Sequence, residues 1–407
     1  MFGGPTDYIF DAEFPTRNLI GLVVRAERLG PPPYGRISYE IDCIDEHANP
    51  IDSAGEFSEK DYAILRVVTT PNRFARMVGK EPNEGDCIQL SIQKDPKYPS
   101  PIVYHSQLRE EGYVEQSRGR LEKAEMLPDI DESRPRYPLS SAPTRGLSLI
   151  QNVLSNFSFP DNGFRAKKIF KNLPKASHII VHDVGQANFI TAFTAGIPIL
   201  HVDAGWPLSF NGRTAPINPS VSKDDAPILL THWDFDHLHG FYKFPHTQSS
   251  VWIVPSQPLG PGCLKIARRL LSNGNLITWD QESLGEAVGI VFKCAGAGKN
   301  NLNAIVIILS LIGGKNVLLS GDADYYSMRK GMTKRKFHGL VVTHHGANFR
   351  GSAPAPVSSD GECVISVGSG NVYRHPRCQS LKKHLSKGWC IKATGDVLNS
   401  RRGDVQL

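Results

Sequence analysis

The segment APILLTHWDFDHLHG carries four potential metal ligands within six residues. They follow an apolar run that is expected to end a strand, and they are His232, Asp234, Asp236 and His237. A solvated polar loop is the alternative interpretation, but aspartates are rarely buried unless they are paired or bind a metal. Imidazole and carboxylate groups suit zinc, manganese or iron, and this tight spacing lets one loop serve two neighbouring ions. The segment therefore predicts a site for divalent metal ions.

Two later segments repeat the arrangement of a strand followed by candidate ligands. In KNVLLSGDAD, Asp322 is a candidate bridging ligand, and Asp324 is expected to cap a following helix. In GLVVTHHGA, His344 and His345 follow another apolar strand. Adjacent side chains point in different directions, so one histidine is expected to bind metal and the other to orient it or contact substrate.

Three stretches of the chain differ in the elements that they predict. Residues 1–107 contain several β-branched strands and a short helix at about Arg73–Val78, which predicts a small β-rich domain that is OB-like. Residues 108–145 are rich in charge, proline and serine and are interpreted as a linker. In residues 146–407, apolar strands alternate with helical stretches, including LKIARRLLS and YYSMRKGM, which predicts a layered α/β domain that holds the site.

In this order, the motifs H-x-D-x-D-H, LLSGD and HHG resemble those of the metallo-β-lactamase superfamily, whose usual first loop is H-x-H-x-D-H. With aspartate at position 234 in place of the second histidine, this loop resembles that of the branch formed by the ComEC-type DNA-uptake hydrolase domains. Three further segments resemble that branch: HDVGQANFI at 182–190, VDAG at 202–205 and VISVGSGNVYRHP at 364–376. This chain departs from the branch at Ala187, Asn188 and Arg374, and it lacks the membrane-channel segments.

The resemblance implies a four-layer αββα sandwich with one or two metal ions, zinc or manganese, at one sheet edge. It assigns His232 and Asp234 to the first ion, Asp236 and His237 to the second, and Asp322 to a bridging position. The HHG pair, His344 and His345, would complete the shell. The superfamily's middle histidine has no clear match, since only His239 and His246 lie in that interval. One tightly bound and one weakly bound ion is therefore the expectation.

Four further residues take roles from their positions in these motifs. Asp236 is expected to accept the proton of the attacking water as well as bind metal. His375, in the closing motif, is expected to bind metal or to protonate a leaving group. Asp183 and Asp203 lie beside strand ends and are expected to hold loops and ligand histidines.

The favoured activity is hydrolysis of a phosphodiester in nucleic acid, DNA above all, by a metal-activated hydroxide. The net charge of +6 is compatible with a nucleic-acid partner. Arg329, Lys330, Lys334, Arg335 and Lys336 form a basic cluster that would contact phosphates, although a solvated face is the other interpretation. A hydrolase of small phosphodiesters or other metabolites and a non-catalytic binding protein remain alternatives.

The start of the chain and its cysteines indicate a compartment. No basic segment followed by an apolar run begins the sequence, and the longest apolar stretch, about Ala304–Ile312, is far shorter than a bilayer span. The seven cysteines form no C-x-x-C pair, which disfavours a disulfide framework. We expect a cytoplasmic protein without a membrane partner.

Overall fold

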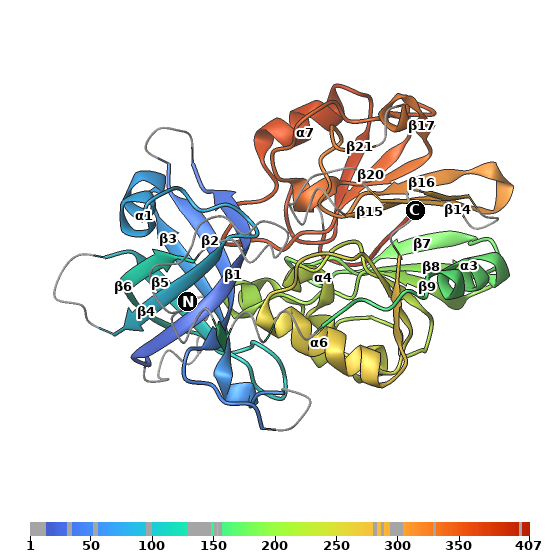
Figure 1. Cartoon of the computed structure of the whole chain (residues 1–407). Coiled ribbons are helices and arrows are strands. Elements are labelled where there is room, and N and C mark those ends of the chain that lie inside the picture. The colour runs from blue at the N-terminus through green and yellow to red at the C-terminus, as the bar shows by residue number, and fades with distance from the viewer. Residues whose placement is uncertain are drawn as a thin grey trace. The chain divides into compact units, whose positions relative to one another are not determined.

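The computed structural model describes residues 14–30, 35–51, 56–94, 100–127, 148–149, 153, 157–279, 283–285, 289–293, 304–328, 331–398 and 401–407. The chain divides into two compact units, which are considered one at a time (Figure 1). The first contains Met1–Ser158 and Leu259–Ile266, and the second contains Phe159–Pro258 and Ala267–Leu407. Most of the helix expected at about Leu147–Leu154 lies outside the described residues.

The first unit is a closed barrel with the strand order β1-β2-β3-β5-β6-β4. All neighbouring strands are antiparallel, and their inward-facing apolar residues form one core. α1 (Pro71–Val78) connects β3 to β4, with a proline in its first turn and Gly79 in the left-handed conformation at its end. The strands are β1 (Arg17–Arg28), β2 (Ile37–Asp45), β3 (Tyr62–Thr69), β4 (Cys87–Gln93), β5 (Ile102–Gln107) and β6 (Ser117–Met126).

A β-rich domain with one helix is confirmed, but its extent was predicted wrongly. The sixth strand, β6, lies inside the segment interpreted as a linker, and it pairs with both β4 and β5. Its charged residues are on the outer face of the barrel, while Leu121 and Ala124 are buried. A strand with one solvated face and few apolar residues gives little signal in composition, which explains the error.

The second unit contains two seven-stranded sheets. The first has the order β12-β11-β10-β9-β8-β7-β22 and the second the order β13-β14-β15-β16-β18-β20-β21. The first consists of β7 (His178–Val181), β8 (Ile190–Thr194), β9 (Ile197–Val202), β10 (Ile228–Leu229), β11 (Trp252–Val254), β12 (Leu276–Thr278) and β22 (Val405–Gln406). The second consists of β13 (Ser283–Gly285), β14 (Gly289–Lys293), β15 (Ile305–Ser310), β16 (Asn316–Leu319), β18 (Gly339–Val341), β20 (Glu362–Ile365) and β21 (Cys390–Ala393).

One apolar cluster joins the two sheets face to face. It combines side chains of the first sheet, such as Leu229 and Ile253, with side chains of the second, such as Ile307 and Leu319. The alternate residues of the second sheet are also buried, in a separate cluster that includes Leu318. Burial on both faces explains the almost continuous apolar runs in the sequence. The helices are α3 (Gly163–Asn172), α4 (Phe235–Leu238), α5 (Gly240–Lys243), α6 (Pro261–Ser272) and α7 (Cys378–Leu385).

The prediction of an α/β domain with many strands is therefore confirmed. The apolar strands expected before the three ligand motifs are present as β10, β16 and β18. One expected helix is absent: Tyr325–Met328 form turns, and the rest of YYSMRKGM is partly outside the described residues. Asp324 caps no helix; its carboxylate instead accepts hydrogen bonds from the amide and guanidinium of Arg350. Among the described residues, no helix is both long and apolar enough to cross a bilayer.

A buried carboxylate ties the barrel to the first turn of α6, within the first unit. Asp42 has no exposed surface, and its oxygens accept hydrogen bonds from the amides of Gly262 and Cys263 at 2.9–3.0 Å. Burial raises the pKa of Asp42 to about 7, although these hydrogen bonds oppose the increase. The folded state therefore holds a proton on this carboxyl that the unfolded chain loses near pH 4.

This proton makes stability depend on pH. Because the folded pKa of Asp42 is raised from 3.8 to about 7, the free energy of unfolding falls as pH rises through that interval and is level above it. Three pKa units correspond to about 4 kcal/mol. We expect the stability advantage of wild type over Asp42→Asn to shrink by up to that amount between pH 4 and pH 7.5, as measured by urea unfolding. Parallel pH profiles of the two proteins would contradict the assignment.

Candidate metal centre

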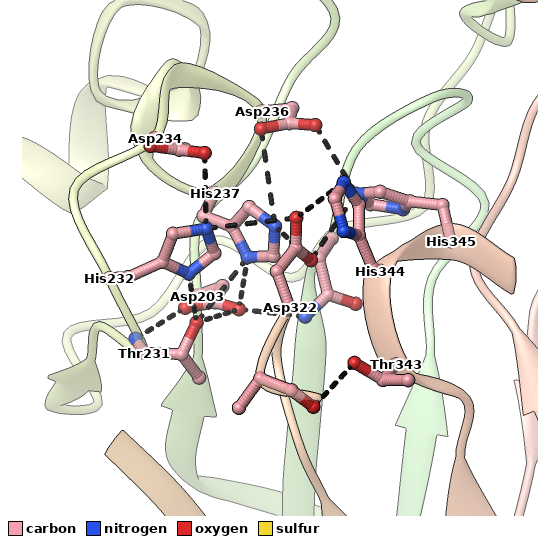
Figure 2. A network of polar contacts seen from close by, with 12 residues as sticks. Asp203, Thr231, His232, Asp234, Asp236, His237, Asp322, Thr343, His344 and His345 are labelled. Carbon is pink, nitrogen blue, oxygen red and sulfur yellow. Dashed lines mark hydrogen bonds and ion pairs between the residues drawn. The ribbon is translucent and has the colours of Figure 1, made fainter. Parts of the chain in front are cut away.

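The candidate ligands lie at one edge of the two sheets because they follow parallel strands. β9, β10 and β11 are parallel neighbours in the first sheet, and β16, β18 and β20 are parallel neighbours in the second. The carboxyl ends of parallel strands meet at the same sheet edge. The loops after β10, β16 and β18 therefore converge, and they bring together His232, Asp234, Asp236, His237, Asp322, His344 and His345 (Figure 2).

Asp322 lies at the centre of this cluster, and each of its oxygens faces two histidines. Oδ1 is 3.0 Å from Nε2 of His237 and 3.9 Å from Nε2 of His345. Oδ2 is 3.4 Å from Nε2 of His344 and 3.8 Å from Nε2 of His232. The four histidines are thus divided into two pairs, one at each oxygen of a single carboxylate.

A second carboxylate accompanies each pair. Asp234 Oδ2 lies 3.4 Å from Nε2 of His232, on the Oδ2 side, and Asp236 Oδ2 lies 3.2 Å from Nε2 of His345, on the Oδ1 side. Two sets of ligand atoms lie close enough to hold an ion: His232, His237 and Asp322 form one, and Asp236, His237 and His345 the other. His237 belongs to both sets, and Asp322 lies between them, 3.8 Å from His232 and 3.9 Å from His345. The arrangement offers two adjacent positions for metal ions.

Hydrogen bonds on the far side of each imidazole direct the Nε2 atoms inward. His345 Nδ1 donates to the Ser366 carbonyl at 2.7 Å, and His237 Nδ1 donates to Asp203 Oδ2 at 2.7 Å. The Thr231 hydroxyl donates to Asp203, so its oxygen accepts the proton of His232 Nδ1. An Nδ1 that carries the proton leaves the Nε2 lone pair available for a metal.

The burial of these lone pairs fits a cation. The Nε2 atoms of His232, His344 and His345 are buried and make no hydrogen bond with any described residue. Buried polar atoms without partners are unfavourable, so a group that accepts their electron pairs would resolve the cost. Zinc, manganese and iron take this mixture of imidazole and carboxylate donors, and the residues present therefore fit a divalent ion.

The HHG turn shows why the two histidines do not point apart as expected. His344 and His345 have φ values of 50° and 51°, in the left-handed region that residues other than glycine rarely occupy. Two consecutive left-handed residues turn both rings toward Asp322 (Figure 2). The strained backbone thereby supplies one imidazole to each oxygen, and His344 faces the same oxygen as His232.

The carboxylates and imidazoles of the cluster stabilise one another's charged forms. Burial lowers the pKa of His237, but Asp322 and Asp203 outweigh it and hold that pKa well above its usual range. Burial raises the pKa of Asp322, but His344 and His237 outweigh it and hold that pKa well below its usual range. Ionised carboxylates thus need positive charge around them, from imidazolium protons or from metal ions.

Three loops around the site interlock through backbone hydrogen bonds. Asn188 donates to the carbonyl of Asp236, Gly205 donates to the carbonyl of Asn188, and Ala204 donates to the carbonyl of His237, all at 2.8–2.9 Å. A Cβ atom at Gly205 would lie 2.0 Å from the Asp236 carbonyl oxygen. Glycine at the end of the VDAG turn therefore allows the chain to approach the ligand loop closely.

The residues expected around the ligands are placed differently from one another. Asp203 accepts hydrogen bonds from His237, Thr231 and Asn188 and has no exposed surface. Asp183 instead accepts hydrogen bonds from the guanidinium of Arg402, and among the described residues it makes no hydrogen bond with a candidate ligand. Burial raises the pKa of Asp183, and Arg402 opposes the increase. Asp203 thus orients a candidate ligand, whereas Asp183 holds the loop that follows β7 to Arg402.

His375 lies beside the cluster, next to His344. Their ring centroids are 5.6 Å apart in an edge-to-face arrangement, and Gln186 Nε2 is 3.4 Å from His375 Nδ1. Gln186 and Thr231 were not singled out by the sequence analysis. Thr231 directly precedes His232, and Gln186 lies inside the motif HDVGQANFI. Their positions in the sequence could therefore have marked both as neighbours of the site.

The basic cluster that was expected to contact phosphates lies at the end of the second sheet away from the candidate ligands. Lys336 belongs to β17 (Lys336–Phe337), ahead of β18, and the His338 amide pairs with the carbonyl of Asn316 at the start of β16. The candidate ligands follow the opposite ends of these two strands. Lys334 and Arg335 are exposed near Lys336, while Arg329 and Lys330 lie outside the described residues. The described part of the cluster is therefore not brought to the site.

Removal of Asp203 should weaken metal binding without removing a ligand. In Asp203→Ala, His237 and Thr231 lose the acceptor that fixes their orientation, and we expect metal affinity to fall by about 10–100-fold. Competition with a chelator measures the affinity. Asp224→Ala is the matched control, because it removes a carboxylate 3.0 Å from His201, a histidine outside the cluster. Equal affinities in the two variants would show that Asp203 does not orient a ligand.

Gly205→Ala should destabilise the second unit. Its Cβ would overlap the Asp236 carbonyl and the Asn188 backbone, and overpacking of this kind costs about 1–3 kcal/mol. Thermal unfolding should show a lower Tm than in wild type. In Gly30→Ala, the added Cβ meets only one atom at 3.5 Å, so this control should unfold like wild type. A Gly205→Ala protein of unchanged Tm would mean that the loops are not tightly interlocked.

No protein-family model matches the sequence, and no curated protein matches it significantly. Solved structures similar to this chain include a diphosphatase from the PhnP family, with 8% sequence identity, a TM-score of 0.33, and coverage of 56% of this chain and 97% of that chain.

Two further similar structures are named as metal proteins or metallo-β-lactamases. CmlA, a diiron β-hydroxylase from Streptomyces venezuelae, has 12% identity, a TM-score of 0.36, and coverage of 94% of this chain and 75% of that chain. The metallo-β-lactamase MIM-1 from Novosphingobium pentaromativorans has 12% identity, a TM-score of 0.22, and coverage of 42% of this chain and 72% of that chain. Similarity at these values does not by itself assign an activity to this chain.

Proposed function

We propose that this chain is a metal-dependent hydrolase of the metallo-β-lactamase fold that cleaves phosphodiesters. One observation carries the proposal: buried imidazoles and carboxylates at a single sheet edge divide into two sets around the two oxygens of Asp322. A solvated polar loop would not bury such groups or fix the Nδ1 proton of three of the histidines through partners on their far side.

Each set has three donors besides Asp322. His232, Asp234 and His344 would hold one ion, and Asp236, His237 and His345 the other. In this assignment His344 takes the place of the superfamily's middle histidine, for which the sequence offers no clear match. Four protein donors on each side favour two ions of similar affinity over one tight and one weak ion. The donor set suits zinc or manganese.

Divalent ions held this way supply an activated water and neutralise the charge that develops on a phosphoryl group. The protein's own residues would complete the reaction. Solvent reaches the cluster chiefly at His344, whose side chain is 16% exposed, and at Asp236, which is 9% exposed. The exposure of Asp236 supports its role as the group that would accept the proton of the attacking water. His375 lies next to His344, where a leaving group would depart.

DNA is the substrate that we favour, on the net charge of +6 and on the resemblance to the ComEC-type hydrolase domains. A small phosphodiester is the second candidate. It is favoured by one finding, that the described basic residues Lys334, Arg335 and Lys336 lie at the end of the sheet away from the metal centre.

The test is hydrolysis of single- and double-stranded DNA, RNA and a small phosphodiester by protein loaded with zinc or manganese, next to Asp236→Ala. Loss of both a metal ligand and the proton acceptor should lower kcat by at least about 100-fold, the range of one general-base contribution. Asp224→Ala, which changes a partly buried aspartate outside the cluster, should retain wild-type rates.

The outcomes separate the candidates. Cleavage of a polymer by wild type but not by Asp236→Ala would support a nuclease and would rank its substrates. Activity confined to the small diester would support the second candidate. A protein that binds no divalent ion and hydrolyses none of these esters would overturn the proposal in favour of a binding protein.

A further inference from the structure

The loop 368–377, which follows β20, lies against the HHG turn of the metal centre. It carries His375, whose ring lies beside that of His344, the most exposed of the candidate ligands. The Arg377 amide donates to the carbonyl of Gly346 at 2.8 Å, which ties the end of the loop to the HHG turn. Any substrate that reaches the ions past His344 therefore passes next to this loop.

The loop is held rigidly by its own side chains and by its neighbours. Asn371 accepts a hydrogen bond from the His375 amide at 3.0 Å and donates to the His375 carbonyl at 2.7 Å. Asn211 accepts from the Val372 amide at 2.9 Å, and Arg213 donates to the Gly370 carbonyl. With these contacts, the backbone between Asn371 and His375 has little freedom to relax.

Arg374 occupies an unfavourable conformation in the middle of this loop. Its φ is 63°, a left-handed value that glycine adopts freely and that other residues adopt at a cost. Strained residues persist where the surroundings over-determine the backbone, and they concentrate at functional sites. In the branch that this sequence resembles, glycine precedes the histidine at this point. An arginine here therefore lowers stability relative to the simplest choice.

The side chain of Arg374 makes no polar contact that would offset this strain. It is exposed, and its guanidinium makes no hydrogen bond or ion pair with the residues that the structure describes. The guanidinium is attached one residue from His375, at the side of the centre that solvent reaches. Arg374 is thus an exposed cation that directly precedes a residue in contact with a candidate ligand, whereas the described basic cluster at 334–336 is at the far end of the sheet.

We infer that Arg374 binds a negatively charged oxygen of the substrate, so that the site selects esters that keep a charge, as phosphodiesters do, over neutral esters. This inference rests on the proposed function and narrows its substrate class. The planar guanidinium presents paired donors that match two oxygens of a phosphate, and charge-assisted bonds of this type are the strong ones. The interaction holds the phosphoryl group on the open side of His344.

Arg374→Gly separates this role from a structural one because the two predict opposite effects on stability. Relief of the left-handed strain should raise Tm by about 2 °C. Loss of a charged hydrogen bond should weaken binding of inorganic phosphate to the zinc-loaded protein by about 10–100-fold, as measured by calorimetry. It should also raise KM for a charged diester by a similar factor and leave kcat/KM for the matching neutral triester unchanged.

Two further variants serve as controls. Ala195→Gly relieves the same kind of strain, φ 50°, in the turn between β8 and β9, at the ends of those strands away from Asp203. It should raise Tm and leave phosphate binding and KM at wild-type values. Arg374→Lys keeps the charge and the strain but not the paired donors, so it should leave Tm unchanged and weaken phosphate binding only in part.

Each outcome decides the inference separately from the proposed function. A more stable Arg374→Gly protein with wild-type phosphate affinity and KM would overturn it, while hydrolysis by wild type would leave the proposed function standing. A zinc-loaded wild type that binds no phosphate would overturn it as well. If wild type hydrolyses none of the esters but binds phosphate through Arg374, the proposed function fails and the anion site remains.

Discussion

The buried carboxylate of Asp322 is the interaction on which the rest of the site depends. It is 1% exposed, and its two oxygens face imidazoles from the loops after β10 and β18, so it joins both sheets at their common edge. A buried charge is unfavourable unless opposite charge surrounds it. The lowered pKa of Asp322 and the raised pKa of His237 both result from the attraction between these buried charges. Two divalent ions would neutralise the carboxylates more completely than imidazolium protons do.

The surrounding structure holds these groups in place at a cost in local conformation. His344, His345, Asp203 and Arg374 all have positive φ values, and all lie within the loops at this edge. A large core between two sheets can sustain such strain, because the strands that carry the loops are almost wholly buried. The hydrogen bonds of Asp203 then fix the orientation of the His237 imidazole, and the close approach at Gly205 holds the loop that carries Asp236.

The apolar runs that end in histidine and aspartate predicted the strands and the candidate ligands, because burial and chemistry favour those residue types. The meeting of the ligand loops at one sheet edge was implied only by the resemblance to the metallo-β-lactamase superfamily. The sequence did not predict that His344 faces the same oxygen as His232, because this depends on two left-handed backbone angles that composition does not reveal. The polar face of β6 concealed a barrel strand inside an apparent linker. Lys336 appeared close to the site because it lies between the motifs in sequence, but strand direction places it at the opposite sheet end.

The most direct test of a two-ion centre bridged by Asp322 is the anomalous scattering of crystals of the zinc-loaded protein, with His344→Ala compared with wild type. Two anomalous peaks in wild type, one next to each oxygen of Asp322, and loss of the peak on the side of His232 in the variant are the result that we predict. A single peak in wild type, or two peaks that persist when His344 is removed, would contradict the assignment of one histidine of the HHG turn to each ion.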